Sequence, residues 1–486
     1  MGSQTCRLPV RGLQMTDFDS SYKVVFSGDP HEDDDVLKVE HDFHLDELAI
    51  SSSAAHEMPT LARDLLHIGM AVYVVDRLTK RPSPQTGGAR AIQLTVEVAD
   101  ADFWRKPSVS EILHDVLDFL GDDYWDVRFT PYCPAHQTYF TKPPPQNGVI
   151  CLYSGGLDSA AGLARTLEKQ DRPVYAVTAE HHTQLKGRVK RHLRIFRRAY
   201  DADLLHVGVD THLVGDASQS SQESSQRCRA FMFAALAGAF ACCSGLCEIE
   251  MYENGVGAAN LPLIYGSGVG GRTTRSAHPT FLRLMSELAT RVARRKIIYK
   301  LPFRKHTKAE LVSALRLSKD LQGLVGDTVS CANFPVRKAG PMHSCGVCPG
   351  CIERRYALAC AGAKEDPKVY EYDWLAENGP EPPVQELDYL RATLLQAHKL
   401  KDVSPDNIPF FVEDYFERTS LVPRNESVEP WTQLLSRYAK EWTGLIERAR
   451  QNGLFWCDWV KHRPQEPNHA ETTRANGPAP DWASAG

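Results

Sequence analysis

GVICLYSGGLDSAAG, at residues 148–162 of this 486-residue chain, carries its strongest structural signal. Residues 148–153 form a nearly continuous apolar run with β-branched and aromatic members, which is typical of a strand buried on both faces of a parallel sheet. Gly155 and Gly156 then allow the backbone to turn sharply. Apolar residues at helical spacing follow from Ala160. The stretch therefore predicts a strand, a tight turn and a helix.

The predicted turn lies at the N-terminus of the predicted helix. Free backbone N–H groups and the positive end of the helix dipole attract anions at such a position. The hydroxyl groups of Ser154 and Ser159 add two more donors. We therefore expect the turn to bind an anionic group of a ligand. The alternative is that the two glycines only close the turn and that Asp158 caps the helix.

Beyond Gly148 the sequence alternates between strand and helix patterns. The further strands are predicted at Val174–Ala179, Leu204–Val209, Glu248–Tyr252 and Lys296–Tyr299. The helices between them are predicted at Gly187–Ala199, Gln226–Ala241 and Pro279–Val292. This alternation predicts an α/β fold with a doubly wound parallel sheet and right-handed crossovers.

Ligands of such sheets bind at the carboxyl ends of the strands. The sequence predicts four polar segments there: Ser154–Ser159, Glu180–Gln184, Asp210–Thr211 and Glu253–Asn254. Because parallel strands end at one edge of the sheet, we expect these segments to surround one crevice. Glu253 and Asn254 are therefore candidate contacts for a substrate.

A glycine-rich segment at residues 266–273 matches a G-x-G-x-x-G template and nearly matches a Walker A loop. A dinucleotide fingerprint needs a helix directly after it, and a Walker A loop needs Lys where Arg272 stands. We therefore predict a flexible loop that covers the crevice. Arg272 or Arg275 would contact a substrate carboxylate or phosphate, since the geometry of a guanidinium group suits both.

Four cysteines have the spacing C-x13-C-x2-C-x2-C: Cys331, Cys345, Cys348 and Cys351. Four thiolates with two short spacings suit tetrahedral Zn²⁺, and a site with no open position is structural. A redox pair is the alternative for one of the two C-x-x-C units. The spacing therefore predicts a zinc knuckle at the C-terminal end of the core domain.

Two further regions flank the predicted core. Residues 1–140 are predicted to form a separate α+β domain, with strands at Tyr22–Phe26, Met70–Val75, Ile92–Val98 and Trp125–Phe129 and helices at Met58–Leu66 and Ser108–Leu120. Residues 366–461 are predicted to form a helical extension, with helices at Glu386–Leu400 and Trp431–Ala449. Residues 462–486 are rich in Pro, Ala, Asn and Gly, which predicts disorder.

Composition narrows the class of protein. The formal net charge of −5 gives no global attraction to nucleic acid or to an acidic membrane. No apolar run reaches the length of a membrane span, and the N-terminus lacks the apolar core of a signal peptide. Because the 13 cysteines come without a secretory signal, we expect a cytoplasmic protein with thiols and a metal site instead of disulfides.

The string Ser-Gly-Gly-x-Asp-Ser resembles the signature of the PP-loop ATP pyrophosphatases, which cut ATP between its α and β phosphates. The resemblance implies that Asp158 helps to bind Mg²⁺ and that the ATP site consists of Ser154, Gly155, Gly156, Leu157, Asp158 and Ser159. Related enzymes carry a Thr-Lys-x-Glu string close to the nucleotide, and residues 307–310 match it. Asp158 and Lys308 are therefore the catalytic candidates. The string also has the spacing of a capping box for a helix through Leu317.

The order of three motifs extends the resemblance to residues 148–365: the Ser-Gly-Gly turn, residues 307–310, and the cysteine segment that runs to Leu358. Together they are similar to the 7-cyano-7-deazaguanine synthase (QueC) family. That family uses ATP to adenylate the carboxylate of 7-carboxy-7-deazaguanine, which an amine then attacks. The resemblance implies ATP and Mg²⁺ as cofactors and Zn²⁺ on the four cysteines.

The added sequence on both sides of the core resembles the enlarged QueC-like subunits of two antiphage systems, Qat and type IV CBASS. For some of those, the activated deazaguanine is transferred to an amine of a partner protein. We therefore expect an ATP-dependent C–N ligase with a co-encoded protein as the acceptor. Three alternatives remain: an ordinary synthase that uses ammonia in a queuosine or deazapurine pathway, a tRNA-modifying PP-loop enzyme, and a non-catalytic subunit of a defence complex.

Overall fold

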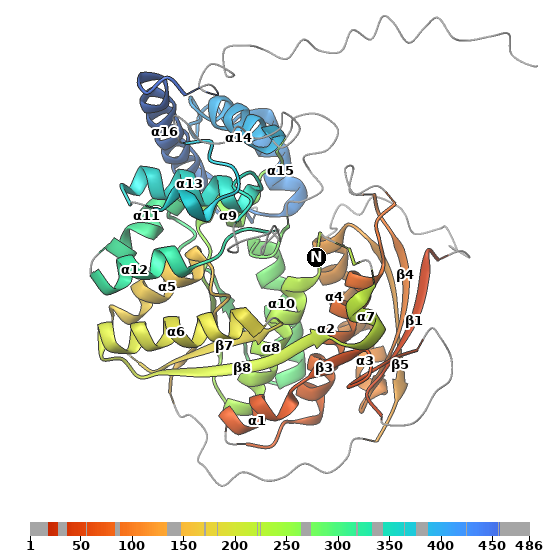
Figure 1. Ribbon diagram of the computed structural model, residues 1–486. Coiled ribbons are helices and arrows are strands. Elements are labelled where there is room, and N and C mark those ends of the chain that lie inside the picture. Colours follow the sequence, from red (N-terminus) through yellow and green to blue (C-terminus); the bar gives the residue numbers. More distant parts are fainter. Residues whose placement is uncertain are drawn as a thin grey trace, which may run out of the picture.

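The computed structural model describes most of the chain. The described residues are 18–27, 36–54, 56–82, 88–133, 147–169, 172–181, 183–220, 222–223, 225–263, 274–316, 319–332, 344–363, 365–375, 387–423, 425–454 and 456. They form two β-sheets with helices between and around them (Figure 1). The predicted disordered tail at 462–486 lies outside the described residues.

The larger sheet has six strands in the order β10-β9-β6-β7-β8-β3. Their bounds are Ile298–Lys300 for β10, Glu248–Met251 for β9, Val149–Leu152 for β6, Val174–Glu180 for β7, Leu204–Leu213 for β8 and Phe43–Leu45 for β3. All pairs are parallel except β3 with β8. All five strands predicted after residue 147 are present, so the predicted parallel sheet is confirmed.

The chain reverses direction across this sheet at β6. It runs from β6 through β7 to β8 on one side, then crosses to β9 and β10 on the other side. Such a reversal is a topological switch point, where the loops after adjacent strands diverge and leave room for a ligand. The Ser-Gly-Gly turn follows β6 directly and therefore lies at this point.

Helices cover both faces of the larger sheet. α5 (Leu157–Leu167) and α6 (Thr183–Tyr200) share a core with one face, where Val149, Val174 and Leu204 lie. α8 (Arg229–Ser244) and α10 (Pro279–Ala293) share a core with the other, together with α2 (Thr60–Leu78). The arrangement is that of a doubly wound sheet.

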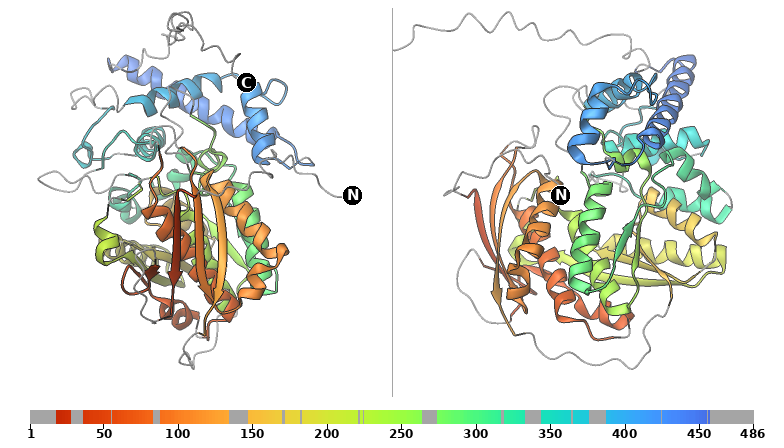
Figure 2. Two further views of the ribbon diagram at one scale, coloured as in Figure 1. Left: turned by 90° about the vertical axis from the view of Figure 1, so that its right-hand side faces the viewer. Right: turned by 180° about the vertical axis from the view of Figure 1, so that it is seen from behind.

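The smaller sheet is also parallel, in the order β2-β1-β4-β5. Its strands are β1 (Ser20–Val25), β2 (Val36–Lys38), β4 (Ala91–Val98) and β5 (Tyr124–Pro131). Two helices lie between β4 and β5 along the chain: α3 (Ala101–Arg105) and α4 (Pro107–Gly121). Figure 2 shows the two sheets on opposite sides of the molecule, with helices between them.

The predicted strand at Met70–Val75 is wrong, because these residues belong to α2. α2 packs between β4 and α8, and every residue from Leu61 to Asp76 is buried. From Ile68 to Val75 this enclosed helix carries no charged side chain, so the stretch lacks the 3.6-residue pattern of an amphipathic helix. A short apolar run therefore does not distinguish such a helix from a buried strand.

The N-terminal region is also less separate than predicted. β3 pairs antiparallel with β8 and extends the larger sheet, with His44 opposite His212. α1 (Glu47–Ala54) packs against α8 and β8. One continuous hydrophobic core contains residues of both sheets, such as Leu94 and Val177.

The C-terminal region consists of helices, as predicted. α14 (Asp388–Lys399), α15 (Phe410–Thr419) and α16 (Glu429–Gln451) gather at one end of the molecule, beside α11 (Lys308–Val312) and α13 (Pro349–Ala361) (Figure 1). Trp442 of α16 is fully buried and stacks on Tyr356 of α13, with ring centroids 4.7 Å apart. The extension is thus packed onto the core domain and is not a loose appendage.

The remaining elements are short. They are α7 (Gly215–Gln219), α9 (Gly255–Ala259), α12 (Lys319–Asp327) and the 3-10 turns at Ser313–Arg316 and Pro367–Val369. The helix predicted to run from residue 307 through Leu317 is shorter: α11 ends at Val312 and continues as a 3-10 turn through Arg316. Within the described residues, no helix is long and apolar enough to cross a membrane.

Candidate active site and metal centre

The turn after β6 favours glycine at both positions. Gly155 has φ of +74°, a left-handed conformation that side chains disfavour. A Cβ atom on Gly156 would lie only 3.2 Å from the carbonyl oxygen of Val329. The Ser159 hydroxyl donates to the carbonyl of Gly156 at 2.9 Å and lies 3.2 Å from the Ser154 hydroxyl. The two serines therefore hold the turn in shape.

Helix α5 begins at Leu157, and no side chain caps its N-terminus in the described structure. The alternative that Asp158 caps this helix is wrong, because its carboxylate is bound to two other side chains. The first turn without a side-chain cap keeps backbone N–H groups that could bind an anion, and the anion site itself stays a prediction.

Asp158 is the centre of a compact polar cluster. Its Oδ2 lies 2.6 Å from the ammonium Nζ of Lys308, which comes from the first turn of α11. Its Oδ1 accepts a hydrogen bond from Asn254 Nδ2 at 3.0 Å. Asn254 also donates to Glu253 Oε1 at 2.6 Å. Four predicted site residues from three distant parts of the chain are therefore in contact; we call them the Asp158 cluster.

The electrostatics of the Asp158 cluster depend on burial. Burial and the charge of Asp158 together raise the pKa of Glu253 to about 8, although the charge of Lys308 opposes both. Burial lowers the pKa of Lys308, but the charges of Asp158 and Glu253 outweigh it and raise that pKa above its usual range. At neutral pH the cluster thus holds a permanent ammonium ion beside a carboxyl group that is largely protonated.

The Asp158 cluster can hold a divalent cation. Mg²⁺ is usually bound through one or two carboxylates together with phosphate oxygens of a substrate. Asp158 and Glu253 offer two such carboxylates beside an unfilled helix N-terminus. A cation would favour the deprotonated form of Glu253, because its positive charge attracts the Glu253 carboxylate and offsets the repulsion from Asp158.

Sequence reasoning missed the residues beneath the Asp158 cluster. Glu353 of α13 is close enough that Lys308 and Asp158 affect its pKa, which burial raises to about 7. Tyr438 of α16 donates to Glu353 Oε1 at 2.9 Å, and Thr307 donates to Glu441 Oε1 at 2.8 Å. A glutamate two residues after the last of the four cysteines was the available signal for Glu353. No local pattern identifies Tyr438 or Glu441.

The two arginine candidates have different outcomes. Arg272 lies outside the described residues. Arg275 binds α4, since it donates to Asp122 Oδ1 at 2.8 Å and to the carbonyl of Phe119 at 2.9 Å. Its guanidinium also lies over the Phe119 ring. These contacts explain Arg275 as a link between α10 and the N-terminal region.

Glu180, the last residue of β7, and Asp210, which lies within β8, belong to a separate ionic group. Glu180 is buried and lies 3.0 Å from Lys186, which also lies 3.2 Å from Asp210. Thr211 is fully buried within β8, which runs on to Leu213. Lys186 thus neutralises the two carboxylates that sequence analysis assigned to the crevice.

The four predicted zinc ligands form a second site. Their sulfur atoms all lie within 4.8 Å of one another. Cys331 and Cys345 are 3.6 Å apart, and Cys345 and Cys351 are 3.9 Å apart. A tetrahedron with Zn–S bonds of about 2.3 Å has S···S edges of roughly 3.8 Å. The cluster therefore fits a tetrahedral metal ion such as Zn²⁺, and its four sulfurs leave no open position.

The local backbone prepares this site for thiolates. The N–H groups of Cys345 and Cys348 point at the sulfurs of Cys331 and Cys345, at 3.3 and 3.4 Å. Gly346 has φ of +85°, and a Cβ there would lie 1.9 Å from the carbonyl oxygen of Tyr372. Because four sulfurs converge, a metal centre explains the geometry better than a redox pair.

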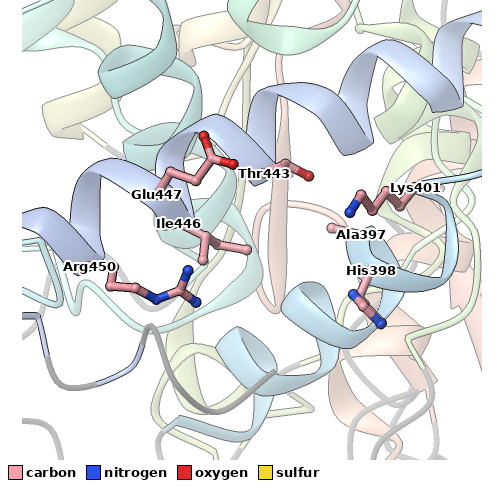
Figure 3. A pocket seen from close by; sticks show the side chains of 7 residues that line it. All are labelled: Ala397, His398, Lys401, Thr443, Ile446, Glu447 and Arg450. Atoms are coloured by element: carbon pink, nitrogen blue, oxygen red, sulfur yellow. The ribbon is translucent and has the colours of Figure 1, made fainter. Parts of the chain in front are cut away.

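A groove lies in the C-terminal extension, away from the Asp158 cluster. Its volume is about 330 Å³, and Figure 3 shows its lining residues on α14, α16 and the turn after α14: Ala397, His398, Lys401, Thr443, Ile446, Glu447 and Arg450. None of them belongs to the polar clusters described above.

Fold and sites together define an α/β protein with a topological switch point and a cluster of four cysteines that could bind a metal ion such as Zn²⁺. No protein-family model matches this chain, and no curated protein matches it either.

Proposed function

We propose that this protein is an ATP-dependent C–N ligase of the 7-cyano-7-deazaguanine synthase type, acting in antiphage defence with a partner protein as the acceptor. The observation that carries the proposal is the contact of Asp158 with Lys308 and Asn254 beside an unfilled helix N-terminus. The Ser-Gly-Gly-x-Asp-Ser string provides the resemblance to PP-loop enzymes. The net charge of −5 argues against the tRNA-modifying alternative.

In the proposed reaction, ATP binds with its β and γ phosphates at residues 154–159. An oxygen of the deazaguanine carboxylate attacks the α phosphorus, and the bond from that phosphorus to the pyrophosphate oxygen breaks. Lys308 stabilises the charge that develops on the leaving pyrophosphate. Asp158 and Glu253 would hold Mg²⁺, which neutralises the phosphates when bound.

The acyl adenylate then reacts with an amine. The amine nitrogen attacks the carbonyl carbon, the bond to the AMP oxygen breaks, and the nitrogen loses its proton as the amide forms. The products are AMP, pyrophosphate and the amide. Zn²⁺ has no part in these steps; the four cysteines would hold the start of α13, which carries Glu353 to the Asp158 cluster.

The partner protein explains the size of the chain. A synthase that uses ammonia needs only a small pocket, whereas a protein acceptor must dock, which commonly takes roughly 800 Å² of surface per partner. The regions before residue 148 and after residue 365 offer such a surface. Holding the amine beside the adenylate converts a bimolecular attack into a nearly unimolecular one.

The test uses the full chain with ATP, Mg²⁺, 7-carboxy-7-deazaguanine and each co-encoded protein. We expect AMP and pyrophosphate to form and the mass of one partner to rise by one deazaguanine acyl group. Both results should disappear with Asp158→Asn. Formation of ADP and phosphate alone would exclude the proposed chemistry, and conversion to the free nitrile with ammonia would favour the ordinary synthase.

A further inference from the structure

One face of α16 meets the elements that carry the Asp158 cluster. The residues of this face recur at intervals of three and four, as one side of a helix requires; they include Leu434, Arg437, Tyr438, Glu441 and Trp442. Leu434 packs directly against Gly255, where a Cβ would lie 2.5 Å from its Cδ2. α16 thus contacts the segment that follows Glu253 and Asn254.

The same face holds the first turn of α11. Thr307 is the N-cap of this helix, and its hydroxyl accepts from the N–H of Glu310 at 3.2 Å while it donates to Glu441 Oε1 at 2.8 Å. Glu310 completes the capping box and binds Arg437 Nε at 2.8 Å. Both members of the capping box are therefore bound by α16.

The position of Lys308 depends on this cap. Lys308 is the first residue of α11, directly after the N-cap, and its side chain is 9% exposed. The first turn of a helix lacks half of its backbone hydrogen bonds and relies on its cap for order. A displacement of about 1 Å in a catalytic group lowers a rate by roughly a hundredfold. The cap is therefore a point at which a distant helix controls the ammonium group.

A second set of contacts joins α16 to α13. Tyr438 donates to Glu353 at 2.9 Å, and the hydroxyl of Tyr356 donates to the Glu441 carboxylate. The rings of Tyr356 and Trp442 stack at an interplanar angle of 9°. Glu441 thus binds α11 through one oxygen and α13 through the other.

We propose that α16 is the positioning element for Lys308, and that Glu441 and Arg437 act through the capping box of α11. The C-terminal extension is then part of the working active site and does more than enlarge the protein. The expected effect on the rate of AMP formation rests on the proposed function. The expected effect on the position of Lys308 is independent of it.

The test compares Glu441→Ala with Glu447→Ala, the same change at an exposed residue of the same helix. Two readouts are taken on the full chain: the kinetics of AMP release, and the acylation of Lys308 by acetic anhydride, followed by peptide mass spectrometry. We expect Glu441→Ala to lower kcat about tenfold with KM for ATP changed less than about twofold, and to raise acylation of Lys308 about threefold. Glu447→Ala should change neither.

Two further variants distinguish a loss of Lys308 positioning from simple unfolding. Glu441→Gln keeps one acceptor oxygen and should restore part of kcat. Arg437→Ala removes a half-exposed side chain and should lower kcat by about threefold. If these variants lower the melting temperature while kcat per folded molecule and Lys308 acylation stay unchanged, the inference is overturned. If acylation rises in Glu441→Ala but the unaltered chain forms no AMP, the proposed function fails and the inference stands.

Discussion

The larger sheet, which is parallel except for β3, and the smaller parallel sheet have the same switch in topology but differ at the ends of their strands. The smaller sheet reverses at β1, whose neighbours β2 and β4 lie on opposite sides, just as the larger sheet reverses at β6. After β1, the N–H groups of Phe26 and Ser27 donate to Glu97 at 2.9 and 2.8 Å. After β4, the N–H groups of Ala99 and Asp100 donate to Asp64 at 2.7 and 3.0 Å.

The difference shows two ways in which a chain treats the backbone N–H groups at a switch point. It either binds them with its own carboxylates, which we call a closed end, or leaves them for a ligand, which we call an open end. Free N–H groups beyond parallel strands attract an anion in either sheet. In the smaller sheet two buried carboxylates of the protein itself, Glu97 and Asp64, take that place. In the larger sheet the turn has glycines and hydroxyls, and the nearby carboxylate of Asp158 is turned to Lys308. We therefore expect substitutions at the closed end to affect stability and those at the open end to affect activity.

The largest effect should come from the metal centre, which supports the open end only. Cys348→Ser should abolish metal binding because it removes one of the four proposed ligands. It should also destabilise the protein, since a structural Zn²⁺ contributes on the order of 10 kcal/mol to folding in small zinc domains. Hydrogen exchange should show α13 unprotected while α2 and β4 remain protected. Cys360→Ser, on the same helix outside the cluster, is the control. Well-folded protein with far less than one zinc per chain would contradict the four-cysteine site.

Asp158→Asn should have the next largest effect. The amide keeps the shape of the side chain but loses the charge that pairs with Lys308 and would bind Mg²⁺. AMP release should fall by about 10²–10³-fold, as for other losses of transition-state electrostatics. The melting temperature should stay within about 4 °C of the unaltered chain. A rate within tenfold would remove Asp158 from the proposed mechanism.

Asp64→Ala tests the closed end. It leaves three donors without this acceptor: the partly buried N–H groups of Ala99 and Asp100 and the buried indole of Trp104. We expect the free energy of unfolding in urea to fall by about 3 kcal/mol, because each unsatisfied group costs about 1–3 kcal/mol. The exposed Asp102→Ala should cost less than about 0.5 kcal/mol. Loss of AMP release from folded Asp64→Ala protein would show that this end is also functional.

The smallest effect concerns pH at the open end. The pKa of Glu253 is about 8 in the folded protein and lower in the unfolded chain, so between these values the folded state binds more protons. Stability without ligands should therefore fall as the pH rises from 6 to 8. Glu253→Gln should show a shallower fall in melting temperature over this range. Identical slopes for both proteins would mean that Glu253 does not titrate there.

Local patterns predicted the parts of the site that depend on neighbouring residues. The turn at residues 154–159 was predicted because glycines, hydroxyls and apolar spacing act within one strand-turn-helix unit. The four cysteines were predicted because two short spacings gather sulfurs around one ion. Glu253 and Asn254 followed from the rule for strand ends. Lys308 entered only through the resemblance to a family.

Long-range packing produced the rest. Met70–Val75 is helical because α2 is enclosed between β4 and α8, an environment that the local sequence does not contain. Tyr438 and Glu441 reach Glu353 and Thr307, the neighbours of the Asp158 cluster, because aromatic stacking docks α16 onto α13.

The chain sequence thus specifies its turns, its cluster of four cysteines and the succession of its strands through short-range preferences of the backbone and side chains. Which strand end is open and which is closed depends on charged side chains that approach from other elements. Asp64 comes to the smaller sheet from α2, and Lys308 comes to the larger one from α11. Because charges separated by many residues interact strongly only after folding brings them out of water, these contacts are properties of the folded molecule.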